Sequence, residues 1–253
     1  MPEGHTLHRL ARDQRRDLRG HKVDVSSPQG RFTESAQRLD RHVIENVDAF
    51  GKHLFTRFDS GDVLHIHLGL IGKIRRQPSP PAPPVGIIRV RIEGPDATWD
   101  LSGPTVCRIV DPAEVERVVS TLGPDPLRRE ADREQFVRNI QRSNKAIGAL
   151  LLDQSVLAGI GNVFRAEVLF VHGIHPSTPG RALDRSTIEA MWDTLSKWLR
   201  DGVRRNRIVT NTVKDPLFVY HRDVCPTCGA PLVALEVANR RIDVCPMCQP
   251  APS

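Results

Sequence analysis

The chain begins Met1-Pro2-Glu3, and the residue types at this end are suited to amine chemistry. A methionine before a small residue such as proline is normally removed, so we expect the mature chain to start at Pro2 with a free secondary amine. An α-amino group has a pKa of roughly 7.7–8.0, so part of it is an unprotonated nucleophile at cellular pH. Such an amine condenses with the aldehyde form of a sugar to give a cationic iminium, and Glu3 beside it is placed to move a proton. The pattern predicts covalent catalysis without a cofactor.

A helix is expected to position this amine. Leu7, Leu10, Ala11 and Leu18 fall on one face at helical spacing, and Gly20 stands where a C-terminal cap belongs. The free N–H groups and the dipole at the start of a helix disfavour protonation of the amine and attract phosphate. Proline and glutamate also begin many helices that have no catalytic role, so these residues alone leave both interpretations open.

The C-terminal end carries a second chemical pattern. Cys225 and Cys228 form one Cys-x-x-Cys pair, and Cys245 and Cys248 form another after sixteen residues. This spacing predicts one tetrahedral zinc ion held by four thiolates. Because protein fills all four positions, we expect the zinc to be structural. The fifth cysteine, Cys107, is expected to be a small core residue.

Between the cysteine pairs the sequence predicts a β-hairpin. Apolar residues alternate from Val233 to Val237 and from Ile242 to Val244, which puts the tip at Asn239-Arg240-Arg241. A guanidinium group forms bidentate bonds to phosphate and keeps its proton. The tip is therefore either a phosphate contact or a solvated turn.

Charge and composition limit the partners. The chain has 253 residues and a formal net charge of +6, with a sequence pI of about 9.4. This balance favours a polyanionic partner, with nucleic acid first, although a merely basic protein has the same charge. No secretory leader and no apolar stretch long enough to span a membrane occur, so we expect a cytoplasmic, nucleoid-associated protein with no membrane partner.

Residues 22 to about 110 have the alternating pattern of short strands, which predicts a β-sandwich. Ile87 to Ile92 is expected to continue these strands, and the proline-rich run Pro78 to Pro84 to form a surface loop. His65 and His67 share one face of a strand, but no third metal ligand is evident in the sequence nearby. We therefore assign them no role.

Asp111-Pro112 is a helix-start signal, and helical patterns follow over 112–120, 132–141, 144–154, 162–172 and 186–200. A capping box, Ser186-x-x-Glu189, is expected to start the last of them. Two glycines precede Asn162, which is a good N-cap for a helix from Val163. The free N–H groups of this turn either hold a phosphate or belong to an ordinary connection between helices. The basic segment from Asp201 to Arg222 is either solvated or faces DNA.

Motifs in a fixed order support the functional interpretations. They are Pro2-Glu3, Gly51–Leu54, His67–Leu70, Leu122–Leu127, Leu150–Gln154, Gly161-Asn162 and the four terminal cysteines. Together they resemble the formamidopyrimidine-DNA glycosylase/endonuclease VIII family of DNA repair enzymes. The resemblance implies an α+β fold: an N-terminal helix on a two-layer β-sandwich (1–111), a helix-two-turn-helix domain (112–222) and a zinc-finger β-hairpin (223–253).

The same resemblance implies roles for individual residues in catalysis. Pro2 would be the nucleophile on C1′ of the damaged nucleoside, and Glu3 the general acid and base. Lys52 would contact the phosphates about the lesion and aid catalysis. The family's usual carboxylate three residues after Glu3 is replaced here by Thr6.

Other residues would bind the DNA. Asn162 and Arg240 match the family's phosphate contacts, with Arg240 counted among the catalytic residues as well. Leu70 would fill the gap left by the flipped nucleotide, assisted by Ile71.

The activity that the resemblance implies is a monomeric, bifunctional DNA glycosylase and AP lyase. It would act on damaged double-stranded DNA and cut the strand by β- and δ-elimination. Gly4, the pair Gly148-Ala149 and the run Val219 to Arg222 are similar to the endonuclease VIII branch, which favours oxidised pyrimidines. Excision of oxidised purines and a non-catalytic protein that binds damaged DNA are the alternatives.

Overall fold

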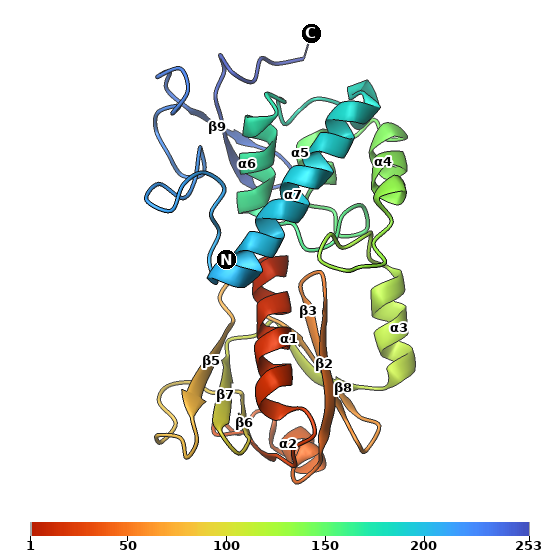
Figure 1. The fold of residues 1–253 in the computed structure, drawn as a ribbon, viewed down its shortest axis with the longest axis vertical. Coiled ribbons are helices and arrows are strands. Elements are labelled where there is room, and N and C mark those ends of the chain that lie inside the picture. Colours follow the sequence, from red (N-terminus) through yellow and green to blue (C-terminus); the bar gives the residue numbers. More distant parts are fainter. Residues whose placement is uncertain (1, 253) are drawn as a thin grey trace. The chain divides into compact units, whose positions relative to one another are not determined.

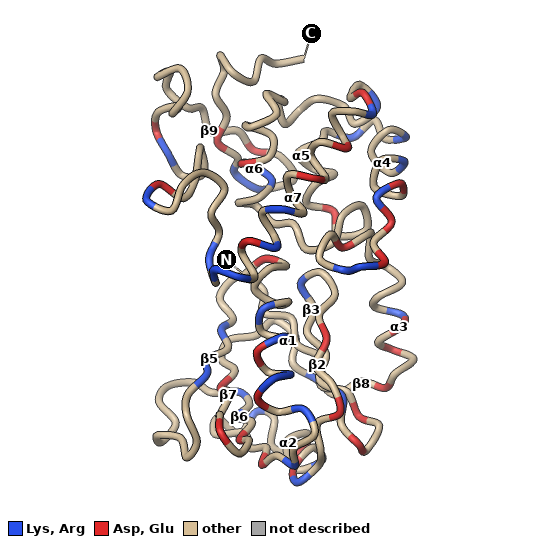
Figure 2. Tube along the Cα trace, viewed as in Figure 1, with Lys and Arg blue, Asp and Glu red and all other residues tan. Residues whose placement is uncertain are grey.

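The computed structural model describes residues 2–252. The chain forms two compact units, Met1–Ser120 and Thr121–Ser253, called here the N-terminal and C-terminal units (Figure 1). Lys and Arg alternate with Asp and Glu along both units, so the positive charge is not gathered in one element (Figure 2). Within residues 2–252, no helix has the length and apolar character needed to cross a membrane.

The N-terminal unit is a β-sandwich with a helix packed on it, as predicted. Its helices are α1 (Gly4–Leu18), α2 (Thr33–Leu39) and α3 (Pro112–Ser120). One antiparallel sheet has the order β1 (Asp24–Ser26), β6 (Val90–Glu93), β7 (Ala97–Ser102) and β5 (Lys73–Pro78). The other has the order β2 (Ile44–Phe50), β3 (His53–Phe58), β4 (Val63–His67) and β8 (Val106–Val110).

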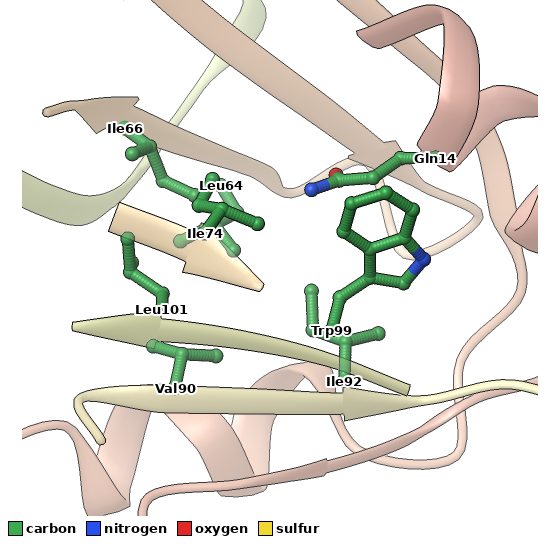
Figure 3. Close-up of a pocket in the computed structure, with 8 residues that line it drawn as sticks. All are labelled: Gln14, Leu64, Ile66, Ile74, Val90, Ile92, Trp99 and Leu101. Atoms are coloured by element: carbon green, nitrogen blue, oxygen red, sulfur yellow. The ribbon is translucent and has the colours of Figure 1, made fainter. Parts of the chain in front are cut away.

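The core of this unit lies between α1 and the two sheets. The predicted apolar face of α1 is buried, and Gly20 has the left-handed φ of +81° that ends a helix. A small cavity remains in the core, lined by Gln14 of α1 and by apolar side chains of both sheets, with the Trp99 ring beside Gln14 (Figure 3). Its lining carries none of the predicted catalytic residues, so it belongs to the core.

Two parts of the N-terminal unit differ from the sequence prediction. The strand expected from Ile87 begins only at Val90, and the Ile87 side chain is 66% exposed. Pro78 ends β5, and the prolines after it lie outside the helices and strands, because proline has no N–H for a sheet ladder. The helix α2 was not predicted and lies within the region expected to form strands.

The C-terminal unit is helical with a terminal hairpin. Its elements are α4 (Arg133–Gln141), α5 (Ile147–Leu150), α6 (Asn162–Val171), η1 (Gly180–Ala182), α7 (Arg185–Arg205), β9 (Val233–Glu236) and β10 (Arg241–Val244). The apolar face predicted for α7, with Trp192 and Trp198, is buried in the core of this unit. The two tryptophans are therefore core residues, as expected.

Two helices differ from their predicted limits because side chains bond to the backbone. The helix expected over 144–154 is limited to α5, since the amide of Gln154 donates to the carbonyls of Leu152 (2.9 Å) and Ile160 (3.0 Å) and holds a turn. The N-cap of α7 is Asp184, whose carboxylate accepts from the Thr187 N–H at 2.8 Å, so the predicted capping box at Ser186 is wrong. Hydrogen bonds, first from the Ser186 hydroxyl, lower the pKa of Asp184 to about 2.

Candidate functional site

The amino end of the described chain places Pro2 and Glu3 immediately before α1. Pro2 is partly exposed, whereas Glu3 is fully buried in an extended conformation at the N-cap. The Glu3 carbonyl accepts from the Thr6 N–H at 2.8 Å, which closes the first helical turn. Burial, followed by the charge of Arg9, lowers the pKa of His5 to about 4. His5 is therefore neutral at pH 7 and adds no positive charge beside the amine.

Lys52 lies at the tip of the hairpin that joins β2 and β3. Phe50 pairs with His53, so Gly51-Lys52 is a two-residue turn, and the φ of +55° at Gly51 suits the first position of a type II′ turn. Lys52 is half-buried.

The geometry of α1 and β2 brings Lys52 to the level of the amino end. The Gly20 N–H donates to the Ile44 carbonyl at 2.8 Å, and the Arg15 guanidinium donates to the Val47 carbonyl. The contacts move back along α1 as they move forward along β2, so the helix and the strand run antiparallel. From Arg15 back to Gly4 is about 16 Å along a helix, and from Val47 on to Lys52 is about 16 Å along a strand. The start of α1 and the β2–β3 turn therefore lie at the same end of the N-terminal unit (Figure 1).

The turn that follows β4 presents two exposed apolar side chains. Leu70 is 55% exposed and Ile71 is 77% exposed. The turn is tied by bonds from Gly72 N to Leu68 O (3.0 Å) and from Thr105 N to His67 O (2.9 Å). Because His67 pairs with His53, this turn adjoins the turn of Lys52. Exposed apolar groups on a fixed turn are suited to insertion between stacked bases.

The β3–β4 register also corrects the interpretation of the histidines. His53 is the third histidine that the sequence did not reveal: its Nδ1 lies 2.9 Å from His65 Nε2, and its ring centre lies 5.0 Å from that of His67. Burial, then the neighbouring histidines and Lys52, lowers the pKa of His53 to about 3. Among residues 2–252, only the four terminal cysteines meet the geometry of a metal site, so the histidines still receive no metal role.

Asn162 is tied to the hairpin of the C-terminal unit. It is the first residue of α6, and Gly161 is the N-cap, so the predicted capping role of Asn162 is wrong. Its side-chain amide instead donates to the Arg241 carbonyl at 2.9 Å and accepts from the Arg165 guanidinium. Asn162 and the hairpin therefore form one local arrangement.

The turn of the hairpin lies one to two residues before its predicted position. Ala238 and Asn239 have φ of +54° and +56°, and Val237 N donates to Arg240 O at 3.0 Å. This is the pattern of a two-residue type I′ turn, which requires left-handed residues at both central positions. Arg240 closes the turn and is exposed, whereas Arg241 is the first residue of β10.

The sequence interpretation missed two buried charged residues on α6. Arg165 and Glu167 are both fully buried. The Glu167 carboxylate accepts bonds from Thr210 Oγ1 and from three consecutive backbone N–H groups, those of residues 218–220. Both residues interrupt an otherwise apolar run, Val163 to Phe170, and this interruption is the signal that identifies them in the sequence.

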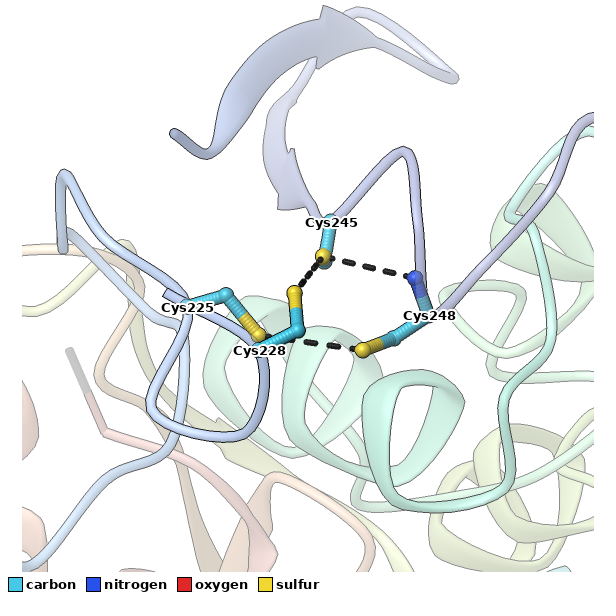
Figure 4. Close-up of side chains that lie close together, drawn as sticks. All are labelled: Cys225, Cys228, Cys245 and Cys248. Atoms are coloured by element: carbon cyan, nitrogen blue, oxygen red, sulfur yellow. Dashed lines mark hydrogen bonds between the residues drawn. The ribbon is translucent and has the colours of Figure 1, made fainter. Parts of the chain in front are cut away.

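The four terminal cysteines converge and fit a metal (Figure 4). Their sulfur atoms all lie within 4.8 Å of one another, with separations of 3.8 Å for Cys225–Cys248 and 3.5 Å for Cys228–Cys245. A tetrahedron with metal–sulfur bonds of about 2.3 Å has sulfur–sulfur edges of about 3.8 Å. The cluster is thus able to bind a metal ion such as zinc.

The pKa values of the thiols also indicate that a cation is needed for all four cysteines to be deprotonated. Burial raises the pKa of Cys225, but hydrogen bonds from the backbone of Cys228 and Thr227 outweigh it and lower that pKa to about 7. Burial and the neighbouring thiols raise the pKa of Cys248 to about 12. All four sulfurs become thiolates together only when a positive ion offsets their mutual repulsion.

Comparison with known proteins identifies the family. A model of the formamidopyrimidine-DNA glycosylase N-terminal domain matches residues 1–118, and a model of the H2TH domain of the same glycosylase matches residues 122–214. Endonuclease 8 1 of Mycobacterium tuberculosis is 41% identical over 267 residues, which cover 98% of this chain and all of that protein. The chain belongs to the formamidopyrimidine-DNA glycosylase family.

Other family members share less sequence but the same fold. The formamidopyrimidine-DNA glycosylase of Nocardioides sp. is 31% identical, with 94% of this chain and 84% of that protein covered. The Lactococcus lactis glycosylase, solved bound non-covalently to DNA with an AP site, has a TM-score of 0.84 at 24% identity and covers 98% of this chain and 100% of that one. The α+β fold predicted from the sequence is therefore confirmed.

In this family member the predicted site residues form two groups. Pro2, Glu3 and Lys52, with the turn of Leu70 and Ile71, lie at one end of the N-terminal unit. A second group in the C-terminal unit holds Asn162, Arg240 and the four cysteines.

Proposed function

We propose that this enzyme, a base-excision-repair DNA glycosylase and AP lyase, excises oxidised pyrimidines from double-stranded DNA. The observation that carries the proposal is the 41% identity to Endonuclease 8 1 over the whole of that protein, against 31% to a formamidopyrimidine-DNA glycosylase. Gly4 and the run Val219 to Arg222, which are similar to the endonuclease VIII branch, support the same choice.

Pro2 and Glu3 perform the covalent chemistry. The Pro2 nitrogen attacks C1′, the glycosidic bond breaks, and the base leaves with a proton that Glu3 helps to deliver. The sugar ring opens to an iminium, which withdraws electrons while the 3′ and then the 5′ phosphate are eliminated. Water hydrolyses the remaining iminium, which leaves the sugar fragment as an aldehyde and frees the Pro2 amine. The buried position of Glu3 supports this role, because it keeps bulk water from competing for the proton.

Lys52 and the turn after β4 receive the damaged strand. The ammonium of Lys52 contacts the phosphates next to the lesion, at the same end of the unit as Pro2. Leu70 enters the stack where the nucleotide leaves it, and Ile71 packs beside it. Their exposure of 55% and 77% supports this role, since neither side chain has to leave a core to reach DNA.

The C-terminal unit supplies the remaining phosphate contacts. The protein acts on DNA as a monomer, so both units come from the same chain. Asn162 and Arg240 donate to the backbone of the DNA, and Arg240 thereby helps to hold the reacting nucleotide. One structural zinc ion on Cys225, Cys228, Cys245 and Cys248 fixes the hairpin that carries Arg240. We place the limits of the three functional parts at 111/112 and 222/223.

Covalent trapping with borohydride tests this proposal. Duplexes with an abasic site, thymine glycol, 5-hydroxyuracil or 8-oxoguanine are incubated with protein of mass-verified N-terminus. We expect adducts through Pro2, with the two pyrimidine lesions above 8-oxoguanine. The reverse ranking would favour oxidised purines, and the absence of any adduct from protein that starts at Pro2 and binds DNA would favour a damage-binding protein.

Two variants separate chemistry from binding. Pro2→Gly should bind DNA while strand cleavage collapses, and protein that retains Met1 is the matched control because its Pro2 nitrogen is part of an amide. Unchanged cleavage by either would remove Pro2 from the mechanism. Arg240→Ala should weaken binding to every duplex alike and reduce the salt slope by about one, since a phosphate contact carries no base information.

A further inference from the structure

The Arg165 side chain connects α6 to both sides of the hairpin turn. Its guanidinium lies fully buried. One terminal nitrogen donates to the carbonyls of Gly148 (3.2 Å) and Val237 (3.0 Å). The other donates to Asn162 Oδ1 and to the carbonyl of Arg241 (3.2 Å), with the Arg240 carbonyl at 3.4 Å.

These carbonyls flank the residue that is proposed to bind phosphate. Val237 precedes the Ala238–Asn239 turn, and Arg240 and Arg241 follow it. A planar guanidinium with five N–H donors in fixed directions is able to hold several carbonyls at once, which an ammonium group does with less geometric control. Arg165 therefore fixes the backbone on both sides of the turn that presents the Arg240 side chain.

Asn162 takes part in the same set of bonds. Its amide donates to the Arg241 carbonyl at 2.9 Å, the carbonyl that also accepts from Arg165. Its oxygen accepts from Arg165 directly. The side chain of Asn162 and the backbone of Arg240 thus both bond to Arg165.

We propose that Arg165 is a positioning residue that holds Asn162 and Arg240 in the arrangement that binds DNA phosphate. The inference rests on the proposed function of those two residues. Without the guanidinium, the backbone at Arg240 has to be ordered when DNA binds, which reduces affinity by about 5- to 30-fold. This cost is of the order that one hydrogen bond to a charged group is worth, so the phosphate contact of Arg240 should be lost. The steps at C1′ are carried out by the N-terminal unit, so the cleavage rate at saturating DNA should change little.

A double-mutant cycle tests the inference. The dissociation constant of a duplex with a tetrahydrofuran abasic analogue is measured against salt for wild type, Arg165→Met, Arg240→Ala and the double variant. We expect Arg165→Met to bind about 5- to 30-fold more weakly and to lose about one unit of salt slope. The double variant should bind DNA more tightly than the product of the two single effects predicts, because in the Arg240→Ala background Arg165 has only Asn162 left to position. For Arg165→Met, the loss should be larger in the dissociation constant than in single-turnover cleavage at saturating DNA, because Arg165 lies outside the unit that carries out the steps at C1′.

Arg91→Met is the matched control for loss of a buried arginine. Arg91 is also buried, pairs with Asp100 at 2.7 Å and donates to the Ala82 carbonyl at 3.1 Å, but belongs to the sandwich. Both methionine variants should unfold at lower temperature, and only Arg165→Met should change the salt slope. Should Arg165→Met lose zinc or fail to fold, Arg165→Lys replaces it, with an expected affinity between those of wild type and Arg240→Ala.

Three results would overturn the inference. Arg165→Met or Arg165→Lys with wild-type affinity and salt slope would refute it while the phosphate contact of Arg240 stands. Effects of Arg165→Met and Arg240→Ala that multiply in the double variant would show that the two residues act independently. Wild-type affinity of Arg240→Ala would remove the phosphate contact itself, and this inference with it.

Discussion

Replacement of Gly69 by alanine tests whether the turn after β4 must hold its shape. Gly69 has a φ of +66°, and a Cβ on it would lie 1.9 Å from Thr105 Oγ1 and 3.1 Å from Thr105 Cβ. Gly61, with a φ of +85° and no atom within 4 Å of its Cβ position, is the matched control. Gly61→Ala carries the cost of the backbone conformation, whereas Gly69→Ala carries that cost and the clash.

The two contributions have separate magnitudes. An alanine in the left-handed region costs about 1–2 kcal/mol of folding free energy, which is the whole effect expected for Gly61→Ala. The contact with Thr105 adds about 1–3 kcal/mol for overpacking. Gly69→Ala should therefore destabilise the protein by about 2–5 kcal/mol. In the double variant Gly69→Ala/Thr105→Ala the Thr105 hydroxyl is absent, so most of the stability lost through the clash should be recovered.

Urea unfolding measures the stability part of this prediction, with the slope of the unfolding free energy against urea compared among the variants. Single-turnover cleavage of a lesion duplex measures the functional part. Gly69→Ala should cleave more slowly than wild type because the turn that carries Leu70 has moved, and Gly61→Ala should cleave like wild type. Equal stability of the two alanine variants, or no recovery on removal of the Thr105 hydroxyl, would refute the assignment of the clash.

Three further predictions concern the metal, the pH dependence and the buried carboxylate. Cys228→Ser should bind less than one equivalent of zinc and lose affinity for DNA, and full zinc occupancy measured by elemental analysis would count against the four-thiolate site. The pKa values of His5 and His65 are both lowered to about 4. Burial is the main cause for both, followed by the charge of Arg9 for His5 and of Arg108 for His65. The unfolded chain therefore binds more protons between about pH 6.5 and 4, and stability should fall in that range by at most about 3 kcal/mol per histidine, which urea unfolding at pH 7 and 5 would test. Glu167→Gln leaves two of four donors without a carboxylate oxygen and should cost about 2–4 kcal/mol. The partly exposed, ion-paired control Glu134→Gln should cost little, because solvent screens its pair with Arg185; equal melting temperatures of the two variants would contradict the prediction.

Periodic apolar patterns predicted the N-terminal unit well because they report burial directly. The face of α1 and the two sheets follow from spacings of 3.6 and 2 residues. Those spacings do not show which strands pair or in which register. The contact of His53 with His65 therefore became evident only from the β3–β4 register. The position of Lys52 level with the amino end likewise depends on α1 running antiparallel to β2, which Arg15 and its bonds reveal. The residue types of this site were predictable from sequence, whereas their proximity was not.

In the C-terminal unit, prediction from the sequence missed the places where buried charged residues replace apolar contacts. A charged residue in a helix is ordinarily read as part of a solvated face, yet Arg165 and Glu167 of α6 are both fully buried. Residues two apart point about 200° apart around a helix, so the two side chains leave α6 on opposite sides. Arg165 bonds to the hairpin, and Glu167 bonds to the segment that leads to the first cysteine pair. The hairpin is thus attached to α6 by hydrogen bonds between residues as far as 79 positions apart, and no local pattern predicts such bonds. The affinity of the proposed phosphate contacts should therefore depend on α6 as much as on zinc.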